Sequence, residues 1–167
     1  GSGIIGMTIA YELLSEDSLL TIAIIDKEDD VAKHASGRNS GVLHAGFYYT
    51  ANSLKAKFTV DGNRLMKKFC NENNIFVKNT QKIVVAKDEK ELEGIYELQK
   101  RAEINGVDTK VITEEEVLKI DSNIKTYKKA LFSPNTASVD PKEVCYKLRD
   151  ILKEKGQEIG LDIKVQH

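Results

Sequence analysis

The segment Gly1-Ser2-Gly3-Ile4-Ile5-Gly6 decides the fold class, because its glycines have the spacing of a dinucleotide-binding loop. Gly1 permits a tight turn, Gly3 lets the backbone approach a pyrophosphate, and Gly6 allows a helix to pack closely on a strand. The helix that follows points its first amide groups at the phosphates. The residues expected to contact a nucleotide cofactor here are Gly1, Gly3, Ile4, Ile5 and Gly6.

A carboxylate at Asp26 strengthens this interpretation. The stretch 20–25 is nearly all apolar and rich in β-branched residues, which is typical of a strand buried on both faces of a parallel sheet. Asp26 ends that strand, where its carboxylate can accept hydrogen bonds from an adenosine ribose, and we expect Lys27 beside it to join the site. Two alternatives stay open: Gly1-Ser2 as the remnant of an expression tag, and Asp26 as the start of a turn.

Bulk composition favours a small-molecule ligand. The 167 residues are 41% hydrophobic, enough for one domain and part of a second, and their 25 basic and 26 acidic residues nearly balance. We therefore expect no nucleic acid as a partner. Two distant cysteines and the lack of a metal-ligand cluster indicate neither disulfide framework nor metal site, and they fit a cytoplasmic location. No apolar run reaches the length of a membrane span.

Hydrophobic periodicity predicts an α/β fold. In chain order we expect a helix over 4–15, a strand over 20–25, a helix over 53–73, a strand over 77–86 with a turn or an exposed edge inside it, a helix over 88–106, a short helix after Thr113, a strand over 130–133, a helix over 141–156 and a strand over 159–165. The apolar side of the second helix is expected to consist of Leu54, Phe58, Leu65, Met66 and Phe69.

This order of elements indicates a Rossmann-like nucleotide-binding domain interrupted by an α+β substrate domain. We expect residues 1–74 to form the first part of the nucleotide-binding domain, 75–138 part of the substrate domain, and 139–167 the return to the nucleotide-binding domain. The first strand of the βαβ unit should precede Gly1, so we expect the chain to be an N-terminal fragment. An isolated fragment with an uncovered strand edge would be poorly stable or would associate.

The segment 34–57 resembles one known family. It contains Gly41-Val42-Leu43-His44-Ala45-Gly46-Phe47-Tyr48-Tyr49 and Ser53-Leu54-Lys55-Ala56-Lys57, which are similar to the L-2-hydroxyglutarate oxidase/dehydrogenase family of D-amino-acid-oxidase-like flavoproteins. The similarity extends through Gly62-Asn63-Arg64, through 82–86 and 105–107, and through 137–140. It therefore covers essentially the whole chain.

This resemblance implies an FAD-binding domain of the GR2 type and oxidation of L-2-hydroxyglutarate to 2-oxoglutarate, with hydride transfer to flavin N5. The pyrophosphate would lie on the glycine loop, and Asp26 would hold the ribose. The residues that the resemblance places beside the flavin are Ser36, Asn39, Ser40, Gly41, Val42, Leu43 and His44. In the wider superfamily a histidine in such a context can carry a covalent flavin, an outcome that we do not expect at His44.

Oxidation of a 2-hydroxy acid needs a base for the hydroxyl proton and cations for the carboxylates. Histidine titrates near neutral pH, so His44 is the candidate catalytic base, with flavin packing as its alternative role. Tyr48 and Lys55 follow closely and are candidate substrate-binding residues. Lys55 could equally belong to the solvated side of a helix.

Other functions remain open at this stage. The same fold could act on an amino acid or glycerol 3-phosphate, or the chain could be a non-catalytic truncated module. The expected partners are a small 2-hydroxy acid and an electron acceptor, oxygen or a quinone. We expect a cytoplasmic enzyme and leave open a peripheral contact with the inner membrane.

Overall fold

A computed structural model describes residues 1–163 and divides the chain into two compact units. The first contains Gly1–Gly41, Asn73–Phe76 and the segment from Val139 onward. The second contains Val42–Glu72 and Val77–Ser138. Residues 42–72 thus belong to the second compact unit, whereas the sequence analysis assigns 1–74 to the nucleotide-binding domain.

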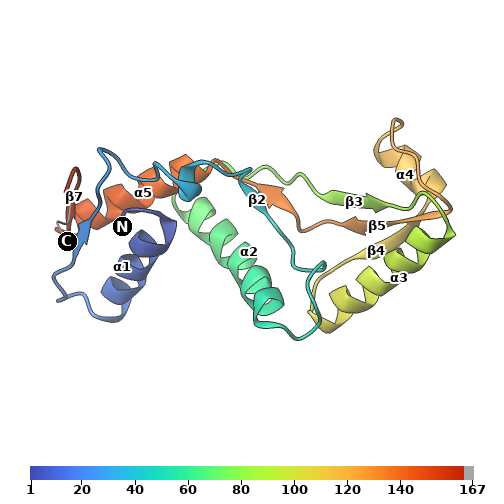
Figure 1. Cartoon of the computed structure of the whole chain (residues 1–167), viewed down its shortest axis with the longest axis horizontal. Helices are drawn as coiled ribbons and strands as arrows, with labels where there is room; N and C mark the ends of the chain where they lie inside the picture. The colour runs from blue at the N-terminus through green and yellow to red at the C-terminus, as the bar shows by residue number, and fades with distance from the viewer. Residues whose placement is uncertain (164–167) are drawn as a thin grey trace. The chain divides into compact units, whose positions relative to one another are not determined.

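The first unit carries the glycine loop. Its elements are α1 (Ile4–Glu16), β1 (Ala23–Ile25), the 3-10 turn η1 (Ala35–Gly37), α5 (Pro141–Glu154) and β7 (Glu158–Gly160). Strands β1 and β7 are parallel, with Ala23 opposite Glu158. Helix α1 buries Met7, Ala10 and Leu14 and packs against α5, whose N-cap is Asp140 with Pro141 in the first turn, as the sequence predicts (Figure 1).

The strand expected over 20–25 is shorter than predicted and is not buried on both faces. Only Ala23–Ile25 is extended, and of these residues Ile24 alone is buried, while Ile25 is 48% exposed. Among the described residues β1 pairs with one strand, β7, so its other edge is unpaired. The last strand is also shorter than expected: Asp162 has a positive φ of 58°, which ends the extended run, and residues 164 and 165 lie outside the described part.

The second unit is built on a three-stranded antiparallel sheet. Its strands β3 (Lys82–Val85), β4 (Lys110–Thr113) and β5 (Lys129–Ser133) have the order β3-β5-β4. A second small sheet pairs β2 (Val42–Leu43) with β6 (Ala137–Ser138). The expected strand over 77–86 is shorter in the structure: Gln81 has a φ of 56°, and the strand β3 begins after it.

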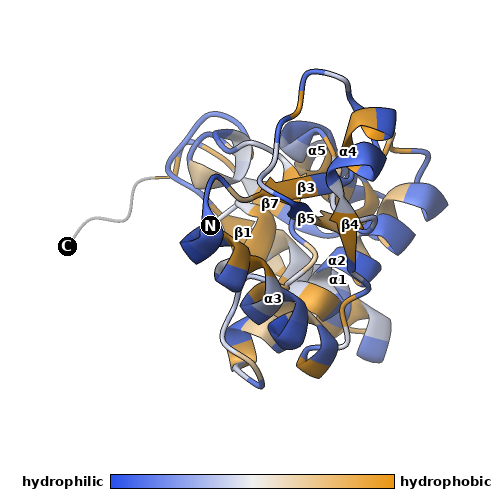
Figure 2. Ribbon diagram, turned by 90° about the vertical axis from the view of Figure 1, so that its right-hand side faces the viewer, coloured by the Kyte–Doolittle hydropathy of each residue, from blue (hydrophilic) through white to orange (hydrophobic). Residues whose placement is uncertain are grey.

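Each face of the three-stranded sheet has its own helix. Val84 and Leu131 lie opposite each other on one face, which is covered by α3 (Glu89–Ile104) together with Ala45 and Phe47. The other face packs against α4 (Glu114–Ile120) through Val117. Strands β3 and β4 are largely orange in Figure 2, the colour of hydrophobic residues. Both helices begin at predicted caps, Asp88 and Thr113, and the capping box of Thr113 with Glu116 is formed.

Helix α2 (Leu54–Glu72) presents a different side to the core than predicted. Leu54 is 70% exposed and Phe58 66% exposed, whereas Ala56 and Cys70 are buried. The reason is a close approach between α2 and the loop before it. Gly46 has a φ of 102°, and a Cβ there would lie 2.7 Å from Val60 Cγ2. The small residues of the helix therefore face the loop. No helix within residues 1–163 is both long and apolar enough to cross a bilayer.

Candidate functional site

The glycine loop is packed so closely that an added Cβ would clash at Gly6 and make a tight contact at Gly3. A Cβ on Gly6 would lie 2.1 Å from the carbonyl oxygen of Gly1, and one on Gly3 would lie 3.0 Å from Ser36 Oγ. A Cβ on Gly1 would make an ordinary 3.7 Å contact with Asp26 Oδ2, so packing does not require a glycine there. The loop thus fits tightly on the helix, as close approach to a pyrophosphate needs.

Ser36 closes the N-terminus of α1. Gly3 is the N-cap and offers no side chain, while Ile4 N donates a hydrogen bond of 2.9 Å to Ser36 Oγ. The predicted cofactor residues Gly3, Ile4 and Ser36 are therefore brought together. The first amides of a helix have no partner within the helix and carry a positive dipole end, which suits an anion.

Asp26 is ionised and tied to the loop. Its Oδ2 accepts hydrogen bonds from Ser2 N at 2.6 Å and Ser2 Oγ at 2.7 Å, and its Oδ1 accepts from Glu28 N at 3.1 Å. Burial raises the pKa of Asp26, but the hydrogen bonds from Ser2 and Glu28 outweigh it and lower the pKa to about 2. A carboxylate has about four acceptor positions, so about one is left for a ribose hydroxyl.

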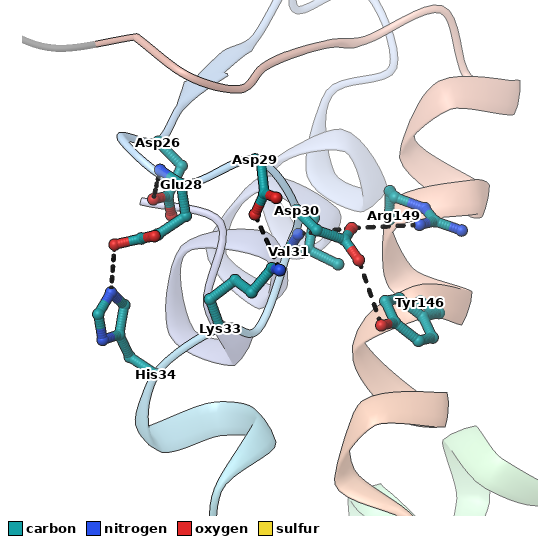
Figure 3. Close-up of polar contacts among 9 residues, drawn as sticks. All are labelled: Asp26, Glu28, Asp29, Asp30, Val31, Lys33, His34, Tyr146 and Arg149. Atoms are coloured by element: carbon teal, nitrogen blue, oxygen red, sulfur yellow. Dashed lines mark hydrogen bonds and ion pairs between the residues drawn. The ribbon is translucent and has the colours of Figure 1, made fainter.

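Charged residues after Asp26 pair with each other and with α5 (Figure 3). His34 Nε2 lies 2.8 Å from Glu28 Oε1, and Lys33 Nζ lies 2.8 Å from Asp29 Oδ1. Asp30 accepts a hydrogen bond of 3.2 Å from the Tyr146 hydroxyl and lies 3.6 Å from Arg149 Nη1. The contacts of Asp30 tie this segment to α5. The predicted cofactor residue Lys27 is exposed and lies 3.8 Å from Glu28 Oε1.

Asn39 shapes the loop that the sequence places beside the flavin. Its Nδ2 donates to the carbonyl oxygens of Ala35 and Ser36, and its Oδ1 accepts from Gly41 N. Both amide hydrogens of Asn39 are thereby used within the loop, which leaves only acceptor capacity for a ligand. Gly41 has a φ of 66°, and a Cβ there would lie 2.1 Å from Val139 O. Ser40 is exposed.

The predicted residues Val42, Leu43 and His44 belong to the second unit. Val42 and Leu43 form β2, and His44 follows with a solvent-accessible side chain. Partial burial of the imidazole, and then the positive charge of Lys82, lower the pKa of His44 below its ordinary 6.5. His44 is therefore neutral at neutral pH, the form that can accept a proton.

Lys82 is a residue of this region that the sequence analysis missed. Its Nζ lies 4.9 Å from the ring centroid of Tyr48, whereas Lys55 Nζ lies over the neighbouring ring of Tyr49 at 4.6 Å. Burial raises the pKa of the Tyr48 hydroxyl, so this phenol is protonated at neutral pH. The structure thus groups Tyr48 with Lys82 and Lys55 with Tyr49. A lysine at the start of an otherwise apolar strand was the available signal for Lys82.

Two asparagines, also missed, hold the loop that carries His44. Asn63 Nδ2 donates to Leu43 O at 2.9 Å, to His44 O at 3.2 Å and to Asn135 O at 3.1 Å. Asn105 accepts from Asn52 N at 3.1 Å and donates to Tyr49 O at 3.2 Å. The loop is therefore fixed from α2 and from the end of α3, which gives His44 a defined backbone position.

Comparison with known proteins agrees with this geometry. The sequence profile of the DAO family, FAD-dependent oxidoreductases, matches residues 1–167. The chain belongs to the DAO family. The L-2-hydroxyglutarate dehydrogenase of Dictyostelium discoideum, described as mitochondrial, is 38% identical over 168 residues, covering 99% of this chain and 38% of that protein. The Escherichia coli L-2-hydroxyglutarate dehydrogenase is 40% identical over 165 residues, covering 99% of this chain and 39% of that protein.

Solved structures show that the DAO fold is shared. FAD-bound L-alpha-glycerophosphate oxidase of Mycoplasma pneumoniae has a TM-score of 0.88 at 24% identity, covering 100% of this chain and 44% of that one. L-proline dehydrogenase from P. horikoshii has a TM-score of 0.85 at 23% identity, covering 99% and 43%. The chain therefore spans about two fifths of the length of the proteins that it matches.

The residues of the first unit fit the cofactor of the DAO family. Gly3 caps α1 without a side chain, so the N-terminus of this helix offers backbone amides to which a pyrophosphate can bind. Asp26, ionised and with an acceptor position to spare, stands beside this loop, where a ribose can bind. FAD contains both groups.

Proposed function

We propose that this chain is part of an FAD-dependent enzyme that oxidises L-2-hydroxyglutarate to 2-oxoglutarate. The observation that carries the proposal is the position of His44, on a loop whose backbone Asn63 holds through Leu43 O and His44 O, with Lys82 near enough for its charge to lower the pKa of the imidazole. A neutral base and a neighbouring cation are what a 2-hydroxy acid requires. The identity of 38% and 40% to two L-2-hydroxyglutarate dehydrogenases supports the choice of substrate.

In this proposal each unit has a separate task. In the first unit, the α1 N-terminus and Ser36 bind the pyrophosphate side of the cofactor, and Asp26 binds its ribose. In the second unit, His44 accepts the proton of the C2 hydroxyl as the C2 hydride leaves. FAD, when bound, supplies the hydride acceptor at N5. The oxidation therefore yields the 2-oxo acid, one proton on the imidazole and a reduced cofactor.

The substrate is tested on the natural full-length protein under anaerobic conditions. L-2-hydroxyglutarate, glycerol 3-phosphate and an L-amino acid are each added, and the flavin absorption near its long-wavelength maximum is followed. We expect bleaching with L-2-hydroxyglutarate and none, or far slower bleaching, with the other two. Equal or faster bleaching with either alternative would assign the fold to that substrate.

The base is tested with a matched pair of histidine variants. His44→Ala should slow flavin reduction by about 100-fold or more, which is a typical contribution of a positioned base. His34→Ala is the control, because His34 is 62% exposed and pairs with Glu28 in the other unit. It should reduce the flavin at the wild-type rate. Equal rates for His44→Ala and wild type would leave His44 with flavin packing as its only role.

The electron acceptor and the location are also proposals. Oxygen or a quinone would reoxidise the cofactor, and the rate of reoxidation with each distinguishes them. The use of only two cysteines, far apart in sequence, supports a reducing, cytoplasmic environment.

A further inference from the structure

Lys82 occupies a particular position on the three-stranded sheet. In the antiparallel pairing of β3 with β5, Lys82 is opposite Ser133 and Val84 is opposite Leu131. Side chains alternate along a strand, so Lys82 shares the face of Val84. That face is the one covered by Ala45 and Phe47, which flank the His44 loop on its C-terminal side. The backbone alone therefore directs Lys82 toward the loop of the candidate base.

Tyr48 fixes the ammonium group. Lys82 Nζ lies 4.9 Å from the Tyr48 ring centroid, a cation–π contact, and the Tyr48 ring packs against Phe47 with centroids 4.4 Å apart. Phe47 is only 1% exposed, so the Tyr48 ring packs against a buried side chain. A lysine held in this way is preorganised and loses little side-chain freedom when it binds a ligand.

The charge of Lys82 is not neutralised by the protein. Within residues 1–163 no carboxylate lies at ion-pair distance from Lys82, although Lys128, which also stacks on a tyrosine, pairs with Glu89 at 2.9 Å. The residue opposite Lys82 adds a second polar group. Ser133 is buried, and its hydroxyl has no hydrogen-bond partner. Buried hydroxyls normally have one, so the Ser133 hydroxyl keeps an unused hydrogen-bonding capacity on the face of the sheet that carries Lys82.

We propose that Lys82 binds the C1 carboxylate of the 2-hydroxy acid, with Tyr48 holding its ammonium group and Ser133 contributing a hydroxyl to the same face of the sheet. The assignment to C1 follows from connectivity, since C1 is bonded to the carbon whose hydroxyl proton goes to His44. This inference rests on the proposed function, and it replaces Lys55 as the expected carboxylate-binding residue.

The test uses the natural full-length holoenzyme and glutarate, a dicarboxylate without a C2 hydroxyl, which cannot be oxidised in this way. Its Kd is measured by calorimetry and by the change in flavin absorption. A charge-assisted hydrogen bond predicts that Lys82→Met raises the Kd for glutarate, and the KM for L-2-hydroxyglutarate, by about 10- to 100-fold. Lys82→Arg keeps the charge and should retain most of the affinity.

Lys128→Met is the matched control, because Lys128 also lies over a tyrosine ring, at 4.8 Å from the centroid of Tyr127. It should bind glutarate as the wild type does. FAD content and melting temperature are measured for every variant. If Lys82→Met lowers the melting temperature, the comparison of Lys82→Arg with Lys82→Gln, which differ in charge, decides the question.

The monocarboxylate L-2-hydroxybutyrate distinguishes the two carboxylates of the substrate. Binding at C1 predicts that Lys82→Met weakens both substrates by the same factor. A loss confined to L-2-hydroxyglutarate would overturn the assignment to C1. The role of Lys82 would be overturned by a folded Lys82→Met variant with wild-type affinity for glutarate, or by a loss of glutarate affinity that occurs only in Lys55→Met. Reduction of the wild-type flavin by L-2-hydroxyglutarate would still support the proposed function in either case. A wild-type flavin that no 2-hydroxy acid reduces would contradict the function itself.

Discussion

Ser2 and Asp26 are joined by two hydrogen bonds to the same oxygen, Asp26 Oδ2, one from the Ser2 amide at 2.6 Å and one from its hydroxyl at 2.7 Å. This double contact fixes the carboxylate at the end of β1 relative to the glycine loop, although 24 residues separate the two in sequence. It also consumes acceptor positions on one oxygen and leaves the other, Oδ1, with only the Glu28 amide. The carboxylate that we propose to bind the ribose is thus positioned by the loop that we propose to bind the phosphates.

Asp26→Asn should weaken FAD binding by about 10-fold or more, because a charged acceptor of hydrogen bonds is replaced by a neutral amide. FAD retention on dialysis of the full-length protein measures this. Asp29→Asn is the control, since Asp29 is exposed and pairs only with Lys33. It should retain FAD as the wild type does, and equal loss of FAD in both variants would contradict the role of Asp26.

The same carboxylate predicts a pH dependence of stability. The pKa of Asp26 is about 2 in the folded state, below its ordinary 3.8, so its stabilising contribution is present above pH 3.8 and is lost as the pH falls toward 2. Asp26 is partly exposed, and screening by solvent reduces this contribution to on the order of 1 kcal/mol. Urea unfolding at pH 7 and pH 3 should show a smaller decrease in unfolding free energy for Asp26→Asn than for wild type. An identical decrease would contradict the assignment.

Gly6→Ala should destabilise the loop and abolish tight FAD binding. The added Cβ would lie 2.1 Å from the carbonyl oxygen of Gly1, so the loop or the helix must shift, at about 1–3 kcal/mol. Gly94→Ala is a matched control inside helix α3, where no atom lies within 4 Å of the new Cβ. It should raise the unfolding free energy by about 0.5–1 kcal/mol. Calorimetric unfolding and FAD content measure both, and tight FAD binding by Gly6→Ala would refute the packing argument.

The pH profile of kcat/KM should report His44. Its pKa lies below 6.5 through burial and the charge of Lys82, and only the neutral imidazole accepts a proton, so activity should fall on the acid side of pH 6.5. Lys82→Met removes a positive charge that disfavours protonation. The fall of kcat/KM on the acid side of the profile should therefore move to higher pH in that variant. An unchanged profile would show that the charge of Lys82 does not affect the pKa of His44.

Asn63→Ala should lower both stability and activity, because three carbonyl oxygens lose a donor, at about 1–2 kcal/mol. Activity should fall more than stability explains, since the backbone of His44 is no longer fixed. Asn71→Ala on the same helix is the control, as Asn71 is exposed. Thermal unfolding and kcat are measured for both variants. A wild-type kcat in Asn63→Ala would show that the position of His44 does not depend on the hydrogen bonds of Asn63.

Local sequence signals predicted much of the secondary structure. Caps at Asp88, Thr113 and Asp140 predicted three helix starts, because a short polar side chain can satisfy the first amides of a helix in any tertiary context. Burial was harder to predict. The apolar residues Leu54 and Phe58 suggested the wrong side of α2, since the approach of Gly46 to Val60 depends on a glycine conformation that hydrophobic spacing does not encode.

The residues of the candidate site also differ in whether local sequence signals predict them. Gly3, Ile4 and Asp26 follow from a motif of fixed spacing, whereas Ser36 follows from the family resemblance. The structure joins Ile4 to Ser36 and Asp26 to the glycine loop through Ser2. Lys82 could not be placed near His44 from spacing, because their proximity depends on the register of β3 with β5 and on the packing of a separate loop against that sheet. Long-range pairing of this kind has no local signal.

The most direct test of the central claim is a single-turnover measurement on the full-length holoenzyme. Substoichiometric L-2-hydroxyglutarate is mixed anaerobically with the oxidised protein, and reduced flavin and 2-oxoglutarate are both quantified. We predict one equivalent of 2-oxoglutarate for each flavin reduced. Unreduced flavin in the presence of L-2-hydroxyglutarate, or reduction without formation of 2-oxoglutarate, would contradict the proposed function.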